Sequence, residues 1–98
     1  MKLRYTKTAL RQIDKALSYI KDRSPQGATN IGERVAGIIA MLEDHPYVGQ
    51  ATSRRGARRV VLTPYPYVIF YRIAGEEVIV MRFRHTARRP LFETRGPP

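Results

Sequence analysis

A Ser-Pro pair between two amphipathic stretches constrains the fold of this chain more than any other sequence feature. Before the pair, apolar residues recur at spacings of three and four, as on one helix face (Leu10, Ile13, Leu17 and Ile20). A second stripe of the same kind follows the pair (Ile31, Val35, Ile38, Ile39 and Leu42). Ser24 can cap the second helix, with Pro25 at its first position. Because the link is so short, the pattern predicts an antiparallel helical hairpin.

Strand patterns flank this hairpin on both sides. Residues 2–5 alternate polar and apolar side chains, and Thr6 can cap the helix that follows. His45-Pro46 ends the second helix, and residues 46–57 are expected to form a loop because they contain Pro46, Gly49 and Gly56. Three further strands are predicted at residues 58–63, 67–73 and 78–84. The predicted fold is therefore α+β in the order β-α-α-β-β-β, with the two-helix hairpin packed on a small, mostly antiparallel sheet.

The last predicted strand carries both apolar residues and arginines. Strict alternation places Ile79, Met81 and Phe83 on one face, which we expect to pack on the helices. The same alternation places a second set on the solvent face (Val78, Val80, Arg82 and Arg84). On the preceding strand Tyr67 and Tyr71 share a face, and we expect them to belong to the core or to a partner-binding groove.

Positive charge is concentrated in the second half of the chain. Residues 1–50 contain eight Lys or Arg and five Asp or Glu, a net charge of +3, whereas residues 51–98 contain ten and three, a net charge of +7. All ten cations of the second half are arginines, whose planar fork binds carboxylates and phosphates in pairs. The partner is therefore expected to be anionic: RNA, DNA or an acidic protein surface.

Several functional classes have no signature in this sequence. It contains no Gly-rich phosphate loop and no Ser or Cys nucleophile motif, and its two histidines are 40 residues apart without any cysteine. We therefore expect no metal site, no cofactor and no disulfide. No secretory signal or apolar span is present, so we expect a cytoplasmic protein without membrane contacts.

Four motifs together resemble the RelE/ParE toxin superfamily of type II toxin–antitoxin systems. Residues 66–72 match its strand motif "PYxIxYR", and residues 82–90 match "RxxHxARRP". In the first half, Ser24-Pro25 matches the break in the family's helical hairpin, and Pro46 with Gly49 matches the "P-x-x-G" that ends its second helix. The resemblance covers residues 2–90. It implies one toxin domain over residues 1–90, followed by a flexible tail over residues 91–98.

The resemblance also implies a plasmid stabilisation system and two alternative mechanisms. ParE-like toxins inhibit DNA gyrase and replication, whereas RelE-like toxins are ribosome-dependent endoribonucleases that cut mRNA without a metal. Of the ribonuclease positions, Arg59 and Arg88 match, and His85 is a candidate acid, but Val61 and Val68 replace basic residues. This partial set favours a ParE-like inhibitor over an enzyme. A ParD-like antitoxin of the ribbon-helix-helix class is the implied partner.

The candidate target-binding residues are the basic side chains of the second half of the chain. The set comprises Arg54, Arg55, Arg82, Arg84, His85, Arg88 and Arg89. For His85 two interpretations stay open, because an imidazole titrates near neutral pH but also commonly packs at the edge of a sheet. For the arginines, the alternative is a solvated face with salt bridges to the few carboxylates, such as Glu93.

Overall fold

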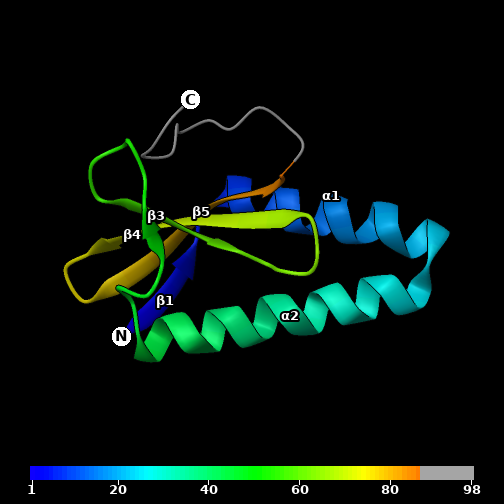
Figure 1. The fold of residues 1–98 in the computed structure, drawn as a ribbon, viewed down its shortest axis with the longest axis horizontal. Helices are drawn as coiled ribbons and strands as arrows, with labels where there is room; N and C mark the ends of the chain where they lie inside the picture. Colours follow the sequence, from blue (N-terminus) through cyan, green and yellow to red (C-terminus); the bar gives the residue numbers. More distant parts are fainter. Residues whose placement is uncertain (87–98) are drawn as a thin grey trace.

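A computed structural model describes residues 1–86 of the chain and confirms the α+β architecture (Figure 1). The elements are β1 (Lys2–Tyr5), α1 (Lys7–Arg23), α2 (Pro25–Asp44), β2 (Gln50–Ala51), β3 (Ala57–Val61), β4 (Tyr67–Ala74) and β5 (Glu77–His85). The tail predicted at residues 91–98 lies outside the described residues. Figure 1 shows the helices as an antiparallel hairpin whose connecting turn lies well away from the sheet.

The five strands form one sheet in the order β1-β5-β4-β3-β2. β1 runs parallel to β5, and the other neighbours are antiparallel, as predicted. β2 was not predicted, because Gln50 and Ala51 fall inside the expected 46–57 loop. They pair with Arg59 and Arg58 of β3. A strand of two residues is too short to show alternation, which explains why the sequence pattern does not reveal it.

Both helices begin at the expected caps. The Thr6 side chain accepts a hydrogen bond from the backbone N–H of Ala9, and that of Ser24 accepts one from Gly27. All five predicted stripe residues of α2 are buried. On α1 the prediction for Leu10 was wrong, because Leu10 is 51% exposed whereas Ala9 is fully buried. The buried stripe of α1 thus starts one residue earlier, about 100° around the helix axis.

The main core lies between the helices and one face of the sheet. It contains Tyr67, Ile69 and Tyr71 from alternate positions of β4, so the expected core role of the two tyrosines is confirmed. We call this the covered face. The other face carries no helix from residues 1–86 and is called the open face.

A β-bulge at Met81 changes which residues of β5 point to each face. Phe70 pairs with Arg82 and Tyr71 pairs with Val80, so Met81 is an extra residue in β5. Val78 and Val80 therefore belong to the main core, and the predicted placement of these two on the solvent face was wrong. The placement of Ile79 and Met81 on the helices was wrong for the same reason.

Beyond the bulge the predicted alternation holds. Phe83 packs in the main core, and its neighbours Arg82 and Arg84 project to the open face. Thr6 holds the bulge in place: its N–H donates to Val80 O at 3.0 Å, and its hydroxyl donates to Met81 O at 3.1 Å. One residue thus caps α1 and fixes the register that orients the arginines.

Candidate macromolecule-binding face

Four arginines gather on the open face of the sheet. Arg59 lies directly opposite Phe70, which in turn lies opposite Arg82, so Phe70 stands between two arginine residues across three strands. Arg84 follows Arg82 by two residues on the same face, and Arg72 follows Phe70 by two residues on β4. The strand register therefore brings arginines that are distant in the sequence onto one cationic surface.

A small apolar cluster forms the centre of this surface. It consists of Ala57, Val68 and Phe70, with Met81 packed against them. Phe70 is 1% exposed and Val68 is 5% exposed, so the centre is closed to water although neither α1 nor α2 covers it. The stems of neighbouring arginines suit such a position, because they can cover apolar surface while their charged ends remain solvated.

The open-face arginines have no carboxylate partner within residues 1–86. The salt bridge found there joins Arg4 to Glu77 at 3.3 Å, at the opposite end of β5 from Arg82 and Arg84. Arg82 donates to Met81 O at 2.9 Å, and Arg59 donates to the Gln50 side chain at 3.2 Å. The Nε of Arg84 is buried without a hydrogen-bond partner. Within residues 1–86 these cations therefore lack a carboxylate partner, and Glu93, the alternative partner considered above, lies outside the described residues.

The predicted pair Arg54 and Arg55 lies on the turn between β2 and β3, where both residues are exposed. The buried Thr52 hydroxyl holds this turn by donating to Arg54 O at 3.2 Å and to Ala57 O at 3.1 Å. Gly56 closes it with a φ of 79°, a backbone conformation that other residues rarely adopt. The turn leads directly into β3, the strand that carries Arg59.

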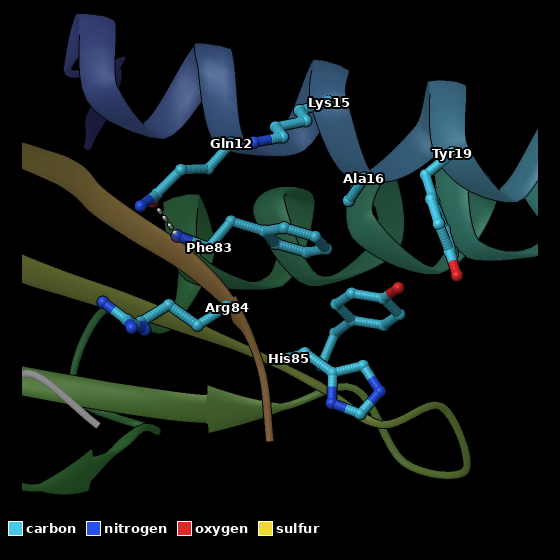
Figure 2. Close-up of a pocket in the computed structure, with 8 residues that line it drawn as sticks. Gln12, Lys15, Ala16, Tyr19, Phe83, Arg84 and His85 are labelled. Carbon is cyan, nitrogen blue, oxygen red and sulfur yellow. Dashed lines mark hydrogen bonds between the residues drawn. The ribbon is translucent and has the colours of Figure 1, made fainter. Parts of the chain in front are cut away.

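His85 lies on the opposite face of β5 from Arg82, although it lines one pocket together with Arg84. Its ring lies edge-on to Tyr67 of the main core, with the ring centroids 5.2 Å apart. Figure 2 shows the Arg84 side chain leaving β5 on the side away from Tyr19, whereas the His85 ring turns toward the space beneath α1. The structure thus places His85 and Arg59 on opposite faces. Arg88 and Arg89 lie outside the described residues.

Two functional positions were missed by the sequence reasoning. Arg72 joins the open face, and its position two residues after Phe70 on the same strand was the available signal. Arg58 points to the covered side and braces the loop before β2, donating to Gly49 O at 2.7 Å and to Tyr47 O at 3.2 Å. Its partners lie about ten residues away, so strand periodicity carries no sign of this role.

The hydroxyl of Tyr71 also holds the loop before β2 in place. This hydroxyl donates to Pro46 O at 2.7 Å and accepts from the Gly49 N–H at 2.9 Å. A side chain at position 49 would collide with the Tyr71 ring, which explains the glycine. Burial raises the pKa of Tyr71, and the Gly49 hydrogen bond and the Arg58 charge act in the opposite direction.

Within residues 1–86, no group of three His, Cys, Asp or Glu side chains is placed to hold a metal ion. Over the same residues, neither helix is long and apolar enough to cross a membrane. What the open face offers chemically is a set of fixed guanidinium donors around an apolar centre. Such an arrangement is suited to an anionic surface.

Comparison with known proteins places this geometry among toxins. A model of the family described as "ParE toxin of type II toxin-antitoxin system, parDE" matches residues 3–90. The Sinorhizobium fredii protein "Putative toxin Y4kP" is 29% identical over 85 residues, which are 86% of this chain and 88% of that protein.

Solved structures show the same fold. A chain of the chromosomal ParDE system from P. aeruginosa superposes with a TM-score of 0.76 at 19% identity, covering 87% of this chain and 95% of that one. The isolated E. coli RelE toxin superposes with a TM-score of 0.65 at 13% identity, covering 90% and 86%. A chain of the RelBE2 toxin–antitoxin complex from Mycobacterium tuberculosis gives 0.60 at 23% identity, covering 89% and 92%.

Proposed function

Because the chain belongs to the ParE toxin family of type II toxin–antitoxin systems, we propose that it inhibits DNA gyrase, and with it replication, until a cognate antitoxin neutralises it. The open face is the proposed contact surface. On this proposal the toxin is a stoichiometric inhibitor that stabilises a plasmid or chromosomal locus by making loss of the antitoxin harmful. It binds its target and transforms no substrate.

The observation that carries this proposal is the separation of Arg59 from His85. Cutting RNA without a metal requires an acid–base group and a cation around the same phosphate. Here His85 packs against Tyr67 on the covered side, whereas Arg59 and Arg82 flank Phe70 on the open face. The cations are thus positioned for binding, and the imidazole is not positioned to assist them.

The alternative is a RelE-like ribosome-dependent endoribonuclease. It is favoured by the alignment of Arg59 and Arg82 on either side of Phe70, since RNA cleavage also needs cations that stabilise a phosphorane. It would require Arg88, which lies outside the described residues, to supply what His85 cannot. We therefore rank this activity second.

The antitoxin is proposed to be a ParD-like protein with a ribbon-helix-helix DNA-binding part. A toxin whose open-face arginines lack a carboxylate partner within residues 1–86 calls for an antitoxin segment that is acidic and apolar. Such a segment pairs carboxylates with the arginines and covers exposed apolar residues such as Leu10, which is 51% exposed. The partner can be tested by sequencing beside the toxin gene, where we expect a short reading frame with that pattern.

Two assays on the purified toxin separate the mechanisms. In the first, gyrase supercoils relaxed plasmid in the presence of increasing toxin, and we expect supercoiling to fall and to recover when the antitoxin is added. In the second, transcript ends are mapped after brief expression of the toxin, and we expect no codon-linked cuts. Undisturbed gyrase together with codon-linked cuts would replace the proposal by the ribonuclease alternative.

A further inference from the structure

A pocket of about 580 Å³ opens between α1 and the last residues of β5. Among residues 1–86, it exists because β1 ends at Tyr5, opposite Val80, while β5 continues to His85 without a neighbouring strand on that side. Helix α1 runs over the gap, and Gln12 partly closes it by accepting a hydrogen bond from the Phe83 N–H at 2.8 Å (Figure 2). Its volume falls within the range of small-ligand sites.

One side of α1 and the covered face of the sheet line this pocket. Residues at positions i, i+3, i+4 and i+7 of α1 form the upper wall (Gln12, Lys15, Ala16 and Tyr19). Tyr67 and Phe83 form an apolar wall opposite, with their rings stacked at a centroid distance of 5.1 Å. A ligand that fills the pocket therefore needs an apolar body as well as a polar group.

The Tyr67 hydroxyl is an unused donor in this pocket. Tyr67 is 9% exposed, yet no hydrogen bond within residues 1–86 involves its hydroxyl. The hydroxyl is solvent-accessible at the pocket wall, so it can donate to an acceptor on a bound ligand.

The charge around the pocket selects an anion. Within residues 1–86 no carboxylate lines it, whereas Lys15 and Arg84 do, and no salt bridge among these residues engages the Lys15 ammonium. Arg11 precedes Lys15 by four residues, and Arg23 stacks on the Tyr19 ring at 3.7 Å, so cations continue along this side of α1. The Lys15 ammonium and the Tyr67 hydroxyl both line the pocket, and both are donors that a carboxylate group can accept from.

We propose that this pocket binds an organic carboxylate with an aromatic or apolar body, held by Lys15 and the Tyr67 hydroxyl against the Tyr67–Phe83 stack. The carboxylate is carried either by a free small molecule or by a side chain of the antitoxin. The site lies mainly on the covered side of the sheet, and of the open-face arginines it includes Arg84 in its lining. This proposal does not rest on gyrase inhibition and can be tested separately from it.

The test is an NMR titration of the purified toxin with 3-phenylpropionate. We expect shifts of the Phe83 and His85 amides, and binding at least tenfold weaker for the uncharged analogue 3-phenylpropionamide. Tyr67→Phe removes only the hydroxyl and Lys15→Met removes only the charge, and each should weaken binding about tenfold, as loss of a charge-assisted hydrogen bond does. Lys21→Met, on α1 outside the pocket lining, is the matched control and should bind as the wild type does.

Equal binding of the acid and the amide, or unchanged binding by both pocket variants while their spectra show a folded protein, would overturn the proposal. A repeat titration on the toxin–antitoxin complex separates the two sources. Loss of the Phe83 shift assigns the pocket to an antitoxin carboxylate, and retention assigns it to a free carboxylate.

Discussion

On the covered face of β4, Tyr67, Ile69 and Tyr71 are at least nine-tenths buried beneath two helices, whereas on the open face Val68 and Phe70 lie among arginines. Water is excluded from the centre of both faces, but for different reasons. Helix side chains close the covered face, and the open face closes around a small cluster flanked by long cationic side chains. Burial alone therefore does not reveal which face supports the fold and which face binds a partner.

The two faces do differ in whether their buried polar atoms have hydrogen-bond partners. Buried polar atoms on the covered side, such as the Tyr71 hydroxyl, mostly have partners, whereas Arg84 keeps a buried Nε without one. Native proteins leave few such atoms unsatisfied. We therefore interpret the covered face as the face that stabilises the fold. We interpret the open face as a binding surface, where an unpaired buried atom lowers the stability of the fold.

Breaking the covered face should have the largest effect on stability. Leu42 is fully buried in the main core, so Leu42→Ala should lower the free energy of unfolding by about 2–5 kcal/mol. Urea denaturation followed by circular dichroism measures this loss. Leu10→Ala, at a position that is 51% exposed on α1, is the control and should change stability by less than about 0.5 kcal/mol. Similar losses for the two variants would contradict the assignment of the core.

Tyr71→Phe should have the next largest effect. The change removes the hydrogen bonds to Pro46 and Gly49, and we expect a loss of about 1–3 kcal/mol in the same experiment. The pH dependence adds a second readout. Because the pKa of Tyr71 is raised above 10.0 by burial, the folded state keeps a proton that the unfolded state releases, and stability falls as pH rises above 10.

The variant should therefore lose stability less steeply above pH 10 than the wild type does. Some of the slope should remain, because burial and the Glu43 charge also raise the pKa of Tyr5. An unchanged slope would mean that Tyr71 does not carry this proton in the folded state.

Arg84→Met should move stability in the opposite direction. The thioether keeps the apolar stem and removes the buried Nε that has no partner, so we expect a gain of up to about 1 kcal/mol. The thermal unfolding midpoint measures it. A clear loss of stability would show that Arg84 is needed for the fold and would weaken the contrast between the two faces.

The second helix, α2, was predicted from the sequence more accurately than the last strand, β5. The stripe from Ile31 to Leu42 has a helical period and two clear caps, and the structure buries every one of its five residues. At Met81 a bulge reverses the alternation of β5, and no Gly or Pro marks it. The bulge depends on Thr6, which lies 75 residues away, and a local pattern cannot express such a contact.

The candidate site was predictable only in part for the same reason. Arg82 and Arg84 reach the open face because they follow the bulge, and Arg59 joins them through pairing across β4. His85 was grouped with them because it is adjacent in sequence, but the next position along a strand points to the other face. Which residues share the site is therefore predicted better by their positions across the sheet than by their adjacency in the sequence.

The central claim is that the open face binds the target of the toxin. It is tested most directly by measuring gyrase inhibition for Arg82→Gln/Arg84→Gln, with the thermal unfolding midpoint recorded on the same samples. The matched control is Lys21→Gln/Arg34→Gln, which removes two positive charges from exposed positions on the helices.

We predict that the open-face variant needs at least about tenfold more toxin for half-inhibition, as expected for lost charge-assisted hydrogen bonds, and that its midpoint does not fall. The control should inhibit as the wild type does. Equal inhibition by the wild type and the open-face variant, or an equal loss in both variants, would contradict the claim.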